Sequence, residues 1–529
     1  MSPRIDSLSR SELIGGMLAA GALAACGGRA NTTFAVPNYG PADRFGIDEI
    51  LSDDIFDTVD KQALVEQFDL SPNLDALHRV FLAQAGQQPQ TAKVILQIPS
   101  QGIVIQSPGT YKFGRDIQWR PRGGPHSAIT ILSSNVTLDF AGFTLTASVA
   151  DKSRQIVGVL VAGLLGPAEN VTITNGTVAG VTEYGILARN AVGLNVSRVT
   201  VTGMRMQNLA IRYLTPAGIQ VSWSNGVAIS GCRVTDLAVT TDSSAGIQLV
   251  GTNQATVTGC SISGLLNNDG AVQGYSYLGC TDVTTVRCTA DSFQSHFNGN
   301  VKTTGHTVIG FCPIFCQNLS FRSCSASGLT GCCDDCHGMS IFLDFNVTVS
   351  GFRANNIVDG VSPSHSGAKA TGLEVYGTTV TVTDCTVSAI KAIKPQDKQA
   401  AGFSAWGSDI TFKRCEASGV SVQNGVGGAI GTGFGWAPDP RKEFRAIPAY
   451  KTTYVDCKAE NCDVGFDTWN HVKSTWICPT YANCTTGILV QLGAKRTISC
   501  NPCSECSPPL KVTLTNLASE NAFRLCKET

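Results

Sequence analysis

The sequence predicts an all-β fold in which parallel strands stack into a solenoid. Glycine followed by an apolar residue recurs along the chain, each pair opens an alternating strand, and most gaps between pairs measure 22 to 34 residues. The pairs are Gly185-Ile186, Gly218-Ile219, Gly246-Ile247, Gly270-Ala271, Gly338-Met339, Gly372-Leu373, Gly402-Phe403, Gly433-Phe434, Gly465-Phe466 and Gly487-Ile488. The one double gap, after Gly270, predicts a further coil near Thr304-Gly305. Such repeats bury their apolar faces only against their neighbours, which is how solenoids fold.

Composition fits this architecture and excludes one class of partner. The chain has 529 residues, of which 55 are glycine, and only 15% of its residues are charged. A repeat array grows by stacking, so this length does not require several domains. The formal net charge is -1, so no basic field points to nucleic acid.

Residues 1–26 are expected to direct export. Arg4 and Arg10 precede an apolar run, Leu13 to Ala25, which is too short to span a bilayer. The segment Leu23-Ala24-Ala25-Cys26-Gly27 resembles a bacterial lipoprotein cleavage box, in which the cysteine becomes the lipidated first residue. The alternative is a plain signal peptide cut nearby. We therefore expect a secreted or cell-envelope protein, held to a membrane only through a lipid on Cys26.

The remaining chain divides into three parts. Residues 27–93 are expected to form a tether and a helical N-terminal cap, because Ser71-Pro72 is a typical helix start and Leu74, Leu77 and Phe81 share one face. Residues 94–520 carry the strands. Residues 500–529 are expected to form a cysteine-rich C-terminal cap.

The 21 cysteines fall into groups with different expected roles. Eight recur at one phase of the repeat and predict a buried thiol column, because stacked strands about 4.8 Å apart place their side chains poorly for disulfides. These are Cys232, Cys260, Cys288, Cys324, Cys385, Cys415, Cys457 and Cys484. Twelve others suit disulfides in an exported chain: Cys280, Cys312, Cys316, Cys332, Cys333, Cys336, Cys462, Cys478, Cys500, Cys503, Cys506 and Cys526. The alternative for Cys312, Cys316, Cys332, Cys333 and Cys336 is a soft metal site.

The opening strands resemble a known superfamily. Pro108-Gly109-Thr110-Tyr111 is followed by Asp116-Ile117 and then by a run from Asn135 to Leu145 with the letters NVTLDFAGFTL. This phrase is similar to the first coils of the pectate-lyase-like superfamily of right-handed parallel β-helices. The resemblance implies a right-handed parallel β-helix over about residues 94 to 520. The superfamily includes polysaccharide lyases, glycosidases, epimerases and tailspikes.

The residues that follow each glycine predict two columns with different roles. Side chains alternate across a strand, so the first and third positions after the glycine share one face. The first position is apolar almost throughout and marks the core. The second and fourth positions are expected to point out of the solenoid. The fourth carries large aromatic rings in the C-terminal half, and a row of exposed rings needs a reason.

These outward columns predict a glycan-binding face. Sugar rings would stack on aromatic side chains while neighbouring polar groups bond hydroxyls, and one coil rises by about 4.8 Å, close to the length of one sugar residue. The expected stacking residues are Tyr376, Trp406 and Trp469, and the expected polar ones are Ser404, Glu374 and Asp467. Arg441, in the loop 437–451, is a candidate partner of an anionic sugar. The alternative is that long loops fold back and bury these rings.

The candidate acid–base residues are Asp334, Asp335, His337, Glu374 and Asp467. The turn Cys332 to Ser340 resembles fragments of polygalacturonase sites, in which paired Asp residues and a Gly-His-Gly segment belong to one centre. Here the fragments are fused, and Cys336 replaces the first glycine. A lyase would need a Lys or Arg base and often calcium, so calcium is the one cofactor considered.

The sequence therefore predicts a cell-envelope enzyme acting on a polysaccharide, with lyase, hydrolase and epimerase chemistry left open. Two alternatives stand beside it. One is a non-catalytic glycan-binding or adhesin-like surface protein, and the other is an envelope protein that handles metal. The sequence does not indicate an oligomeric state.

Overall fold

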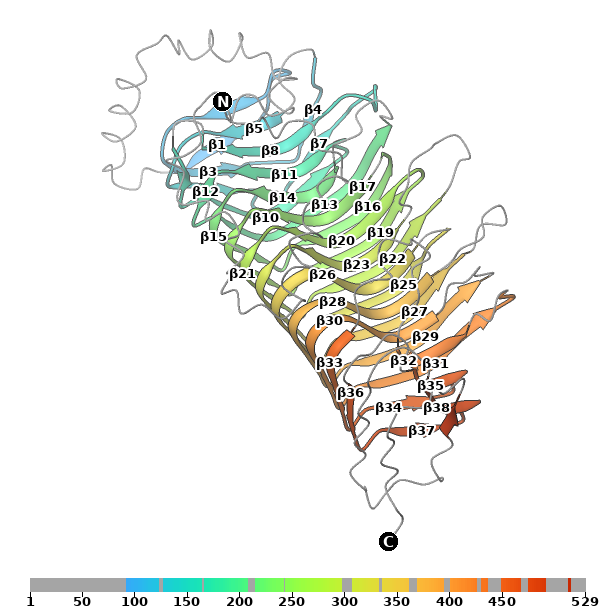
Figure 1. Ribbon diagram of the computed structural model, residues 1–529. Helices are drawn as coiled ribbons and strands as arrows, with labels where there is room; N and C mark the ends of the chain where they lie inside the picture. Colours follow the sequence, from blue (N-terminus) through green and yellow to red (C-terminus); the bar gives the residue numbers. More distant parts are fainter. Residues whose placement is uncertain are drawn as a thin grey trace, which may run out of the picture.

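The protein is a parallel β-helix whose strands stack rung upon rung from the blue N-terminal end to the red C-terminal end (Figure 1). The computed structural model describes residues 92–122, 127–163, 166–207, 215–241, 243–296, 307–332, 335–360, 369–393, 400–425, 430–435, 449–467, 474–490 and 512–514. Within these ranges there are 39 strands and no helix, and consequently no helix able to cross a membrane. The expected helical cap and most of the expected C-terminal cap lie outside them.

The strands form three faces, each a ladder of parallel pairs. We call the first face the glycine sheet. It contains β2 (Ile103–Ile105), β5 (Ser127–Ile131), β8 (Val157–Ala162), β11 (Tyr184–Arg189), β14 (Ala217–Ser222), β17 (Ser243–Val250), β20 (Ala271–Leu278), β23 (Val308–Ile314), the first parts of β26 (Asp335–Ser350), β28 (Lys369–Thr383) and β30 (Ala400–Lys413), then β32 (Gly431–Phe434), β35 (Val464–Asp467), β38 (Thr486–Val490) and β39 (Val512–Leu514).

The second face continues from the first around a corner. It contains β1 (Lys93–Ile95), β3 (Gly109–Phe113), β6 (Val136–Asp139), the first parts of β10 (Thr172–Ala179) and β13 (Asn195–Gln207), β15 (Asn225–Ser230), β18 (Asn253–Thr258), β21 (Thr281–Val286), β24 (Gln317–Arg322), the second parts of β26, β28 and β30, β33 (Ala449–Val455) and β36 (Ser474–Ile477), with the short β9 (Ala168–Glu169) and β12 (Ala191–Val192) beside it.

The third face closes each coil. It contains β4 (Ile117–Trp119), β7 (Thr144–Ala147), the second parts of β10 and β13, β16 (Arg233–Thr240), β19 (Ser261–Asn267), β22 (Thr289–Ser295), β25 (Ser325–Thr330), β27 (Arg353–Asp359), β29 (Thr386–Ile393), β31 (Glu416–Gln423), β34 (Lys458–Glu460) and β37 (Thr480–Ala482).

The predicted apolar column after the glycines is confirmed as the interior. Ile219 pairs with Ile247, Leu373 pairs with Phe403, and all four side chains are fully buried in one core. Further along, the rings of Phe403 and Phe434 stack with centroids 4.8 Å apart. That separation matches the spacing of neighbouring strands. Aromatic rings can therefore replace aliphatic side chains in this column without changing the rise of the solenoid.

A glycine on each coil lets the glycine sheet and the third face approach each other. A Cβ added at Gly246 would lie 2.5 Å from a methyl carbon of Ile262 on β19 and 2.9 Å from the carbonyl oxygen of Gly274 on the next coil. The same two obstacles, an inward side chain and the next glycine's carbonyl, recur along the column. Its members are Gly158, Gly185, Gly218, Gly246, Gly274, Gly310, Gly338, Gly372, Gly402, Gly433 and Gly465. Space, not backbone conformation, requires these glycines.

The structure corrects the predicted repeat at two places. Gly270 is not a member of the column, because Ile247 pairs with Tyr275 and so Gly246 is aligned with Gly274. The extra coil begins at Gly310 and not near Thr304-Gly305, since Tyr275 pairs with Phe311. The prediction failed here because Tyr275 occupies the core position, where a residue without a polar group was expected. Its ring stacks on Phe311 at 4.6 Å, and its hydroxyl donates to the carbonyl of Cys260.

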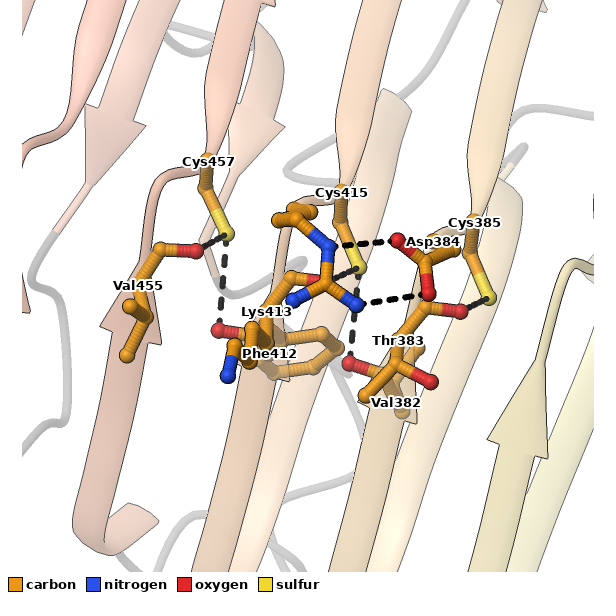
Figure 2. A network of polar contacts seen from close by, with 10 residues as sticks. Val382, Thr383, Asp384, Cys385, Phe412, Lys413, Cys415, Val455 and Cys457 are labelled. Carbon is orange, nitrogen blue, oxygen red and sulfur yellow. Dashed lines mark hydrogen bonds and ion pairs between the residues drawn. The ribbon is translucent and has the colours of Figure 1, made fainter.

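Seven of the eight predicted cysteines do stack at one corner, where each thiol donates hydrogen bonds to backbone carbonyls. Figure 2 shows three of them, and Cys415 bonds the carbonyls of Lys413 and Val382 at 3.5 Å each. Cys232, Cys260, Cys288, Cys324 and Cys457 make the same pair of bonds. A residue with positive φ precedes each, such as Arg414, which also pairs with Asp384. The thiol therefore satisfies carbonyls where the chain turns.

Cys484 belongs elsewhere, and a second corner has its own column. Cys484 follows Asn483 and is aligned with Cys462 one coil earlier, whereas Cys457 lies at the opposite end of β34. At the corner between the first two faces, Thr252, Cys280 and Cys316 occupy equivalent positions and each donates to two carbonyls. A hydroxyl or a thiol group can therefore satisfy the backbone carbonyls at this corner.

Several cysteines that were predicted to form disulfides are single thiols. Cys280, Cys316, Cys336 and Cys462 are free and buried. The physical reason is the same as for the first cysteine column. The Cβ atoms of cysteines on successive coils are one strand spacing apart, which is longer than a disulfide tolerates.

We expect Gly246→Ala to destabilise the protein by about 1–3 kcal/mol, because the added methyl group overpacks the contact with Ile262. Urea unfolding followed by circular dichroism measures the change. The matched control is Gly259→Asn, at a position with φ +60 and nothing within 4 Å of an added Cβ. Asparagine tolerates this backbone conformation, so the control should stay close to wild type. Equal stability of both variants would contradict the packing argument.

Thiol labelling tests the buried columns. In the native protein without reductant, an alkylating reagent should modify Cys484, which is partly exposed, well before the buried Cys280, Cys316, Cys336 and Cys462. After unfolding in denaturant, peptide mass spectrometry should find all five labelled. Disulfide-linked peptides among these five would contradict the structure.

Candidate functional site

The outward side of the glycine sheet carries a compact group of ionisable side chains at β26 and β28. Asp335 pairs in register with Lys369, His337 with Thr371, and Ser340 with Glu374. We call Asp335, His337, Ser340, Lys369 and Glu374 the Lys369 cluster. Each of these residues is less than one tenth exposed. The cluster thus combines acid, base and cation within two neighbouring coils.

Glu374 is the centre of the cluster. One carboxylate oxygen accepts a hydrogen bond from Lys369 Nζ, in an ion pair between nearly buried side chains. The other accepts a hydrogen bond from Ser340 Oγ at 3.2 Å and lies 3.7 Å from His337 Nε2. Burial opposes the charged form, but the positive charges of Lys369 and His337 outweigh it and lower the pKa of Glu374. Glu374 is therefore ionised at neutral pH.

The glycine of each coil explains why these residues share a face. On β26, Cys336 and Met339 both belong to the core, although strict alternation would place them on opposite sides. The alternation is interrupted at Gly338, between them. His337 and Ser340 consequently lie on the same outward side, and both lie beside Glu374. The same interruption at Gly372 brings Lys369 and Glu374 together.

Asp359, at the end of β27, fixes the first residue of β28. Its carboxylate accepts a hydrogen bond from the backbone N–H of Lys369 at 2.8 Å, and the side chain is fully buried. A buried carboxylate bonded to the main chain holds the start of the strand in one place. Asp359 therefore positions Lys369 for its contact with Glu374.

A ladder of aromatic rings lies next to the cluster. Phe342 and Tyr376 have centroids 5.1 Å apart, and Tyr376 meets Trp406 edge to face at 6.0 Å. Trp406 donates from Nε1 to Ser404 Oγ at 3.2 Å, and Lys369 Nζ lies 5.8 Å from its ring centre. The rings thus join the polar cluster to the next coil.

The prediction of an open strip of exposed rings is wrong for the two rings that the structure describes. Tyr376 and Trp406 are each 5% exposed, and burial raises the pKa of Tyr376 to about 12. The polar side chains of the outward second position are buried as well, from Gln220 and Gln248 to Ser404 and Asp467. These side chains are therefore buried rather than exposed, and the loops that were expected to cover them lie outside the described residues.

The structure brings some predicted site residues together and separates another. Asp335, His337 and Glu374 belong to one cluster, beside Ser404, Tyr376 and Trp406. Asp467 lies on β35, three strands along the glycine sheet from β28, which amounts to about 14 Å. This exceeds the separation of the paired carboxylates of glycosidases, about 5–9.5 Å. Asp334, Arg441 and Trp469 lie outside the described residues.

Lys369 is the site residue that sequence reasoning missed. A signal was available: Asp335 and Lys369 both stand three residues before the glycine of their coil, and they carry opposite charges. Alignment on the glycines would have paired them. It went unused because alternation was assumed to run unbroken through the glycine.

Asp344 is a second buried carboxyl with a perturbed pKa, but its contacts are structural. Burial raises its pKa well above the usual value, and the carboxyl accepts hydrogen bonds from the backbone N–H groups of Cys316 and Phe342. It occupies the corner position that Cys316 holds one coil earlier. Separately, no group of three or more His, Cys, Asp or Glu side chains in the described ranges is placed to hold a metal ion. Calcium binding stays a prediction.

Comparison with known proteins gives likeness to solved structures alone. No family model matches this chain, so membership of the pectate-lyase-like superfamily also stays a prediction. No curated protein matches it either. The tailspike protein of E. coli bacteriophage HK620, solved with a pentasaccharide, is 14% identical with a TM-score of 0.46, over 77% of this chain and 71% of that chain. The catalytic domain of a GH87 alpha-1,3-glucanase, solved with nigerose, is 11% identical with a TM-score of 0.35, over 80% and 65%. The site must therefore be argued from its own geometry.

We expect Lys369→Met to destabilise the protein by about 3–5 kcal/mol at neutral pH, because it leaves the buried Glu374 carboxylate without its main cation. The double variant Lys369→Met/Glu374→Gln should recover part of that loss. Urea unfolding measures both. A double variant no more stable than the single one would show that charge compensation is not what holds the cluster.

The pH dependence has a definite sign. In the wild type the pKa of Glu374 is lowered in the folded state, so its contribution to stability is complete above the ordinary glutamate value and is lost as the pH falls through the lowered value. In Lys369→Met, protonation of Glu374 relieves the buried charge. The stability gap between this variant and wild type should therefore shrink at about pH 4. A gap that stays constant from neutral to acid pH would contradict the assignment.

Proposed function

We propose that this chain is a glycan-acting β-helix protein whose ligand binds on the outward side of β26, β28 and β30. The observation that carries the proposal is a buried ionic cluster that the fold does not need. Burying a charged side chain costs free energy of folding unless an opposite charge compensates it. Groups of nearly buried charged side chains are therefore typical of functional sites.

Equivalent positions on other coils show that neutral residues satisfy the fold. The position of Glu374 is occupied by Ser404 on the following coil and by Ser340 on the preceding one. The position of His337 is occupied by Thr371, whose buried hydroxyl has no hydrogen-bond partner. An unsatisfied hydroxyl beside ionised groups and aromatic rings is the setting in which a sugar hydroxyl would find a partner.

The charges of the cluster favour an uncharged glycan. Lys369 is already paired with Glu374, so it supplies no spare positive charge for a sugar carboxylate. A sugar carboxylate would add negative charge to this group. The prediction of an anionic sugar depended on Arg441, which lies outside the described residues.

The choice of an uncharged glycan selects one reaction. β-Elimination and C5 epimerisation remove a proton from the carbon next to a carboxylate, so both require uronic acids. Hydrolysis requires an ionised carboxylate and a neutral carboxylic acid on either side of the glycosidic bond. Glu374 fits the ionised role, because its pKa is lowered. Asp335 is the second carboxyl of the cluster and our candidate for the acid. We therefore propose glycoside hydrolysis as the reaction.

The alternatives differ in what they require. A non-catalytic glycan-binding protein would keep the aromatic ladder and the cluster for affinity alone. A metal-handling protein would need clustered ligands, and the described residues supply none. We also propose that the N-terminal segment exports the protein, with Cys26 as the site of lipid attachment.

A panel of neutral polysaccharides tests the proposal. The purified wild type should bind at least one of them and release reducing ends, whereas Glu374→Gln should keep binding within about tenfold and lose turnover by about a hundredfold or more. Affinity electrophoresis and a reducing-end assay provide the two measurements. Binding without turnover by the wild type would favour the non-catalytic alternative.

The matched control is Glu416→Gln, which removes a partly exposed carboxylate that is paired with Lys458. Binding and turnover should both stay at the wild-type level. If the folded wild type binds no neutral polysaccharide in the panel, the proposed function is wrong.

A further inference from the structure

A second polar stretch lies on the same outward side of the glycine sheet, N-terminal to the Lys369 cluster. Gln220 on β14 and Gln248 on β17 occupy register-paired positions on successive coils. Each side chain is 8% exposed. Their Cα atoms are therefore about one strand spacing, roughly 4.8 Å, apart.

Each of these glutamines buries its Oε1 without a hydrogen-bond partner. Nearly all buried polar atoms in folded proteins have a partner, and an unsatisfied one costs about 1–3 kcal/mol. Two such atoms lie one above the other, and each carries that cost. They form a vertical pair of acceptors that a donor-bearing ligand would satisfy.

The fold accepts apolar side chains at these positions. Gln220 also pairs with Leu187, and Leu187 pairs with Leu160, so leucine fills the same column on the two preceding coils. Leu187 and Leu160 are both buried. The glutamines are therefore not required for packing.

The column continues without interruption to the Lys369 cluster. From Gln248 it passes through Ser276 and Cys312 and reaches Glu374 by way of Ser340. Gln220 and Glu374 are thus five coils apart, or roughly 24 Å. Because one coil rises by about the length of one sugar residue, this distance corresponds to a glycan of roughly six residues.

We propose that Gln220 and Gln248 form a distal subsite that accepts hydrogen bonds from the hydroxyl groups of an uncharged oligosaccharide, whose other end lies at the Lys369 cluster. This inference rests on the proposed function. The orphaned atoms are acceptors, so the ligand has to present donors. A carboxylate or phosphate would place acceptor against acceptor and would be rejected.

The test compares two ligand lengths and one double variant. Gluco-, manno- and galacto-oligosaccharides are measured by calorimetry as disaccharides and as octasaccharides, with wild type and with Gln220→Leu/Gln248→Leu. The octasaccharide that the wild type binds should bind the variant about tenfold more weakly, since two buried hydrogen bonds are lost. Disaccharide affinity should not change. The control is Gln294→Leu on the third face, where the side chain is exposed.

The melting temperature distinguishes a binding role of the two glutamines from a structural one. Removing two unsatisfied buried atoms should leave the melting temperature of the double variant equal to or above that of wild type, whereas amides that support the fold would lower it. A lowered melting temperature, unchanged octasaccharide affinity or equal loss at both lengths would each overturn the distal subsite. If the wild type binds none of these oligosaccharides, the proposed function fails together with it.

Discussion

The architecture depends on one steric constraint, the absence of a Cβ at one position in each coil from Gly158 to Gly465. At each glycine of the column, the carbonyl of the next coil and a side chain from the third face occupy the space that a methyl group would need. This close approach sets the thickness of the interior. It also interrupts the alternation of side chains, so residues before and after the glycine share the outward face. The constraint that packs the core therefore also assembles the Lys369 cluster.

The corners depend on a second constraint, the need to satisfy carbonyls where the chain turns. Residues with positive φ turn the chain, and the next side chain donates back to two carbonyls. Cys415, Thr252 and Cys316 show that a thiol or a hydroxyl serves equally. Small donors with little bulk fit these buried corners, which accounts for the free thiols of the two corner columns.

Charge is placed where the solenoid can tolerate it and where its stability does not require it. The interior is apolar, and most outward positions of the glycine sheet hold neutral side chains. Against this background Lys369 and His337 each lie within ion-pair distance of Glu374. The attraction between opposite charges offsets the cost of removing them from water. Burial also lowers the effective dielectric constant, which strengthens that attraction.

The sequence alone determined the solenoid, its period and its interior column, because every coil repeats the same local pattern of glycine, apolar residue and turn. It also identified Glu374, His337 and Trp406 as residues of interest. It could not pair Lys369 with Glu374, separate Asp467 from both, or show that Tyr376 and Trp406 are buried. Those facts depend on how many coils lie between two residues, on the interrupted alternation at each glycine and on what covers the outward face. Tertiary structure decided them, because stacking converts distance along the chain into height along the solenoid, and an error of one coil moves a side chain by a full strand spacing.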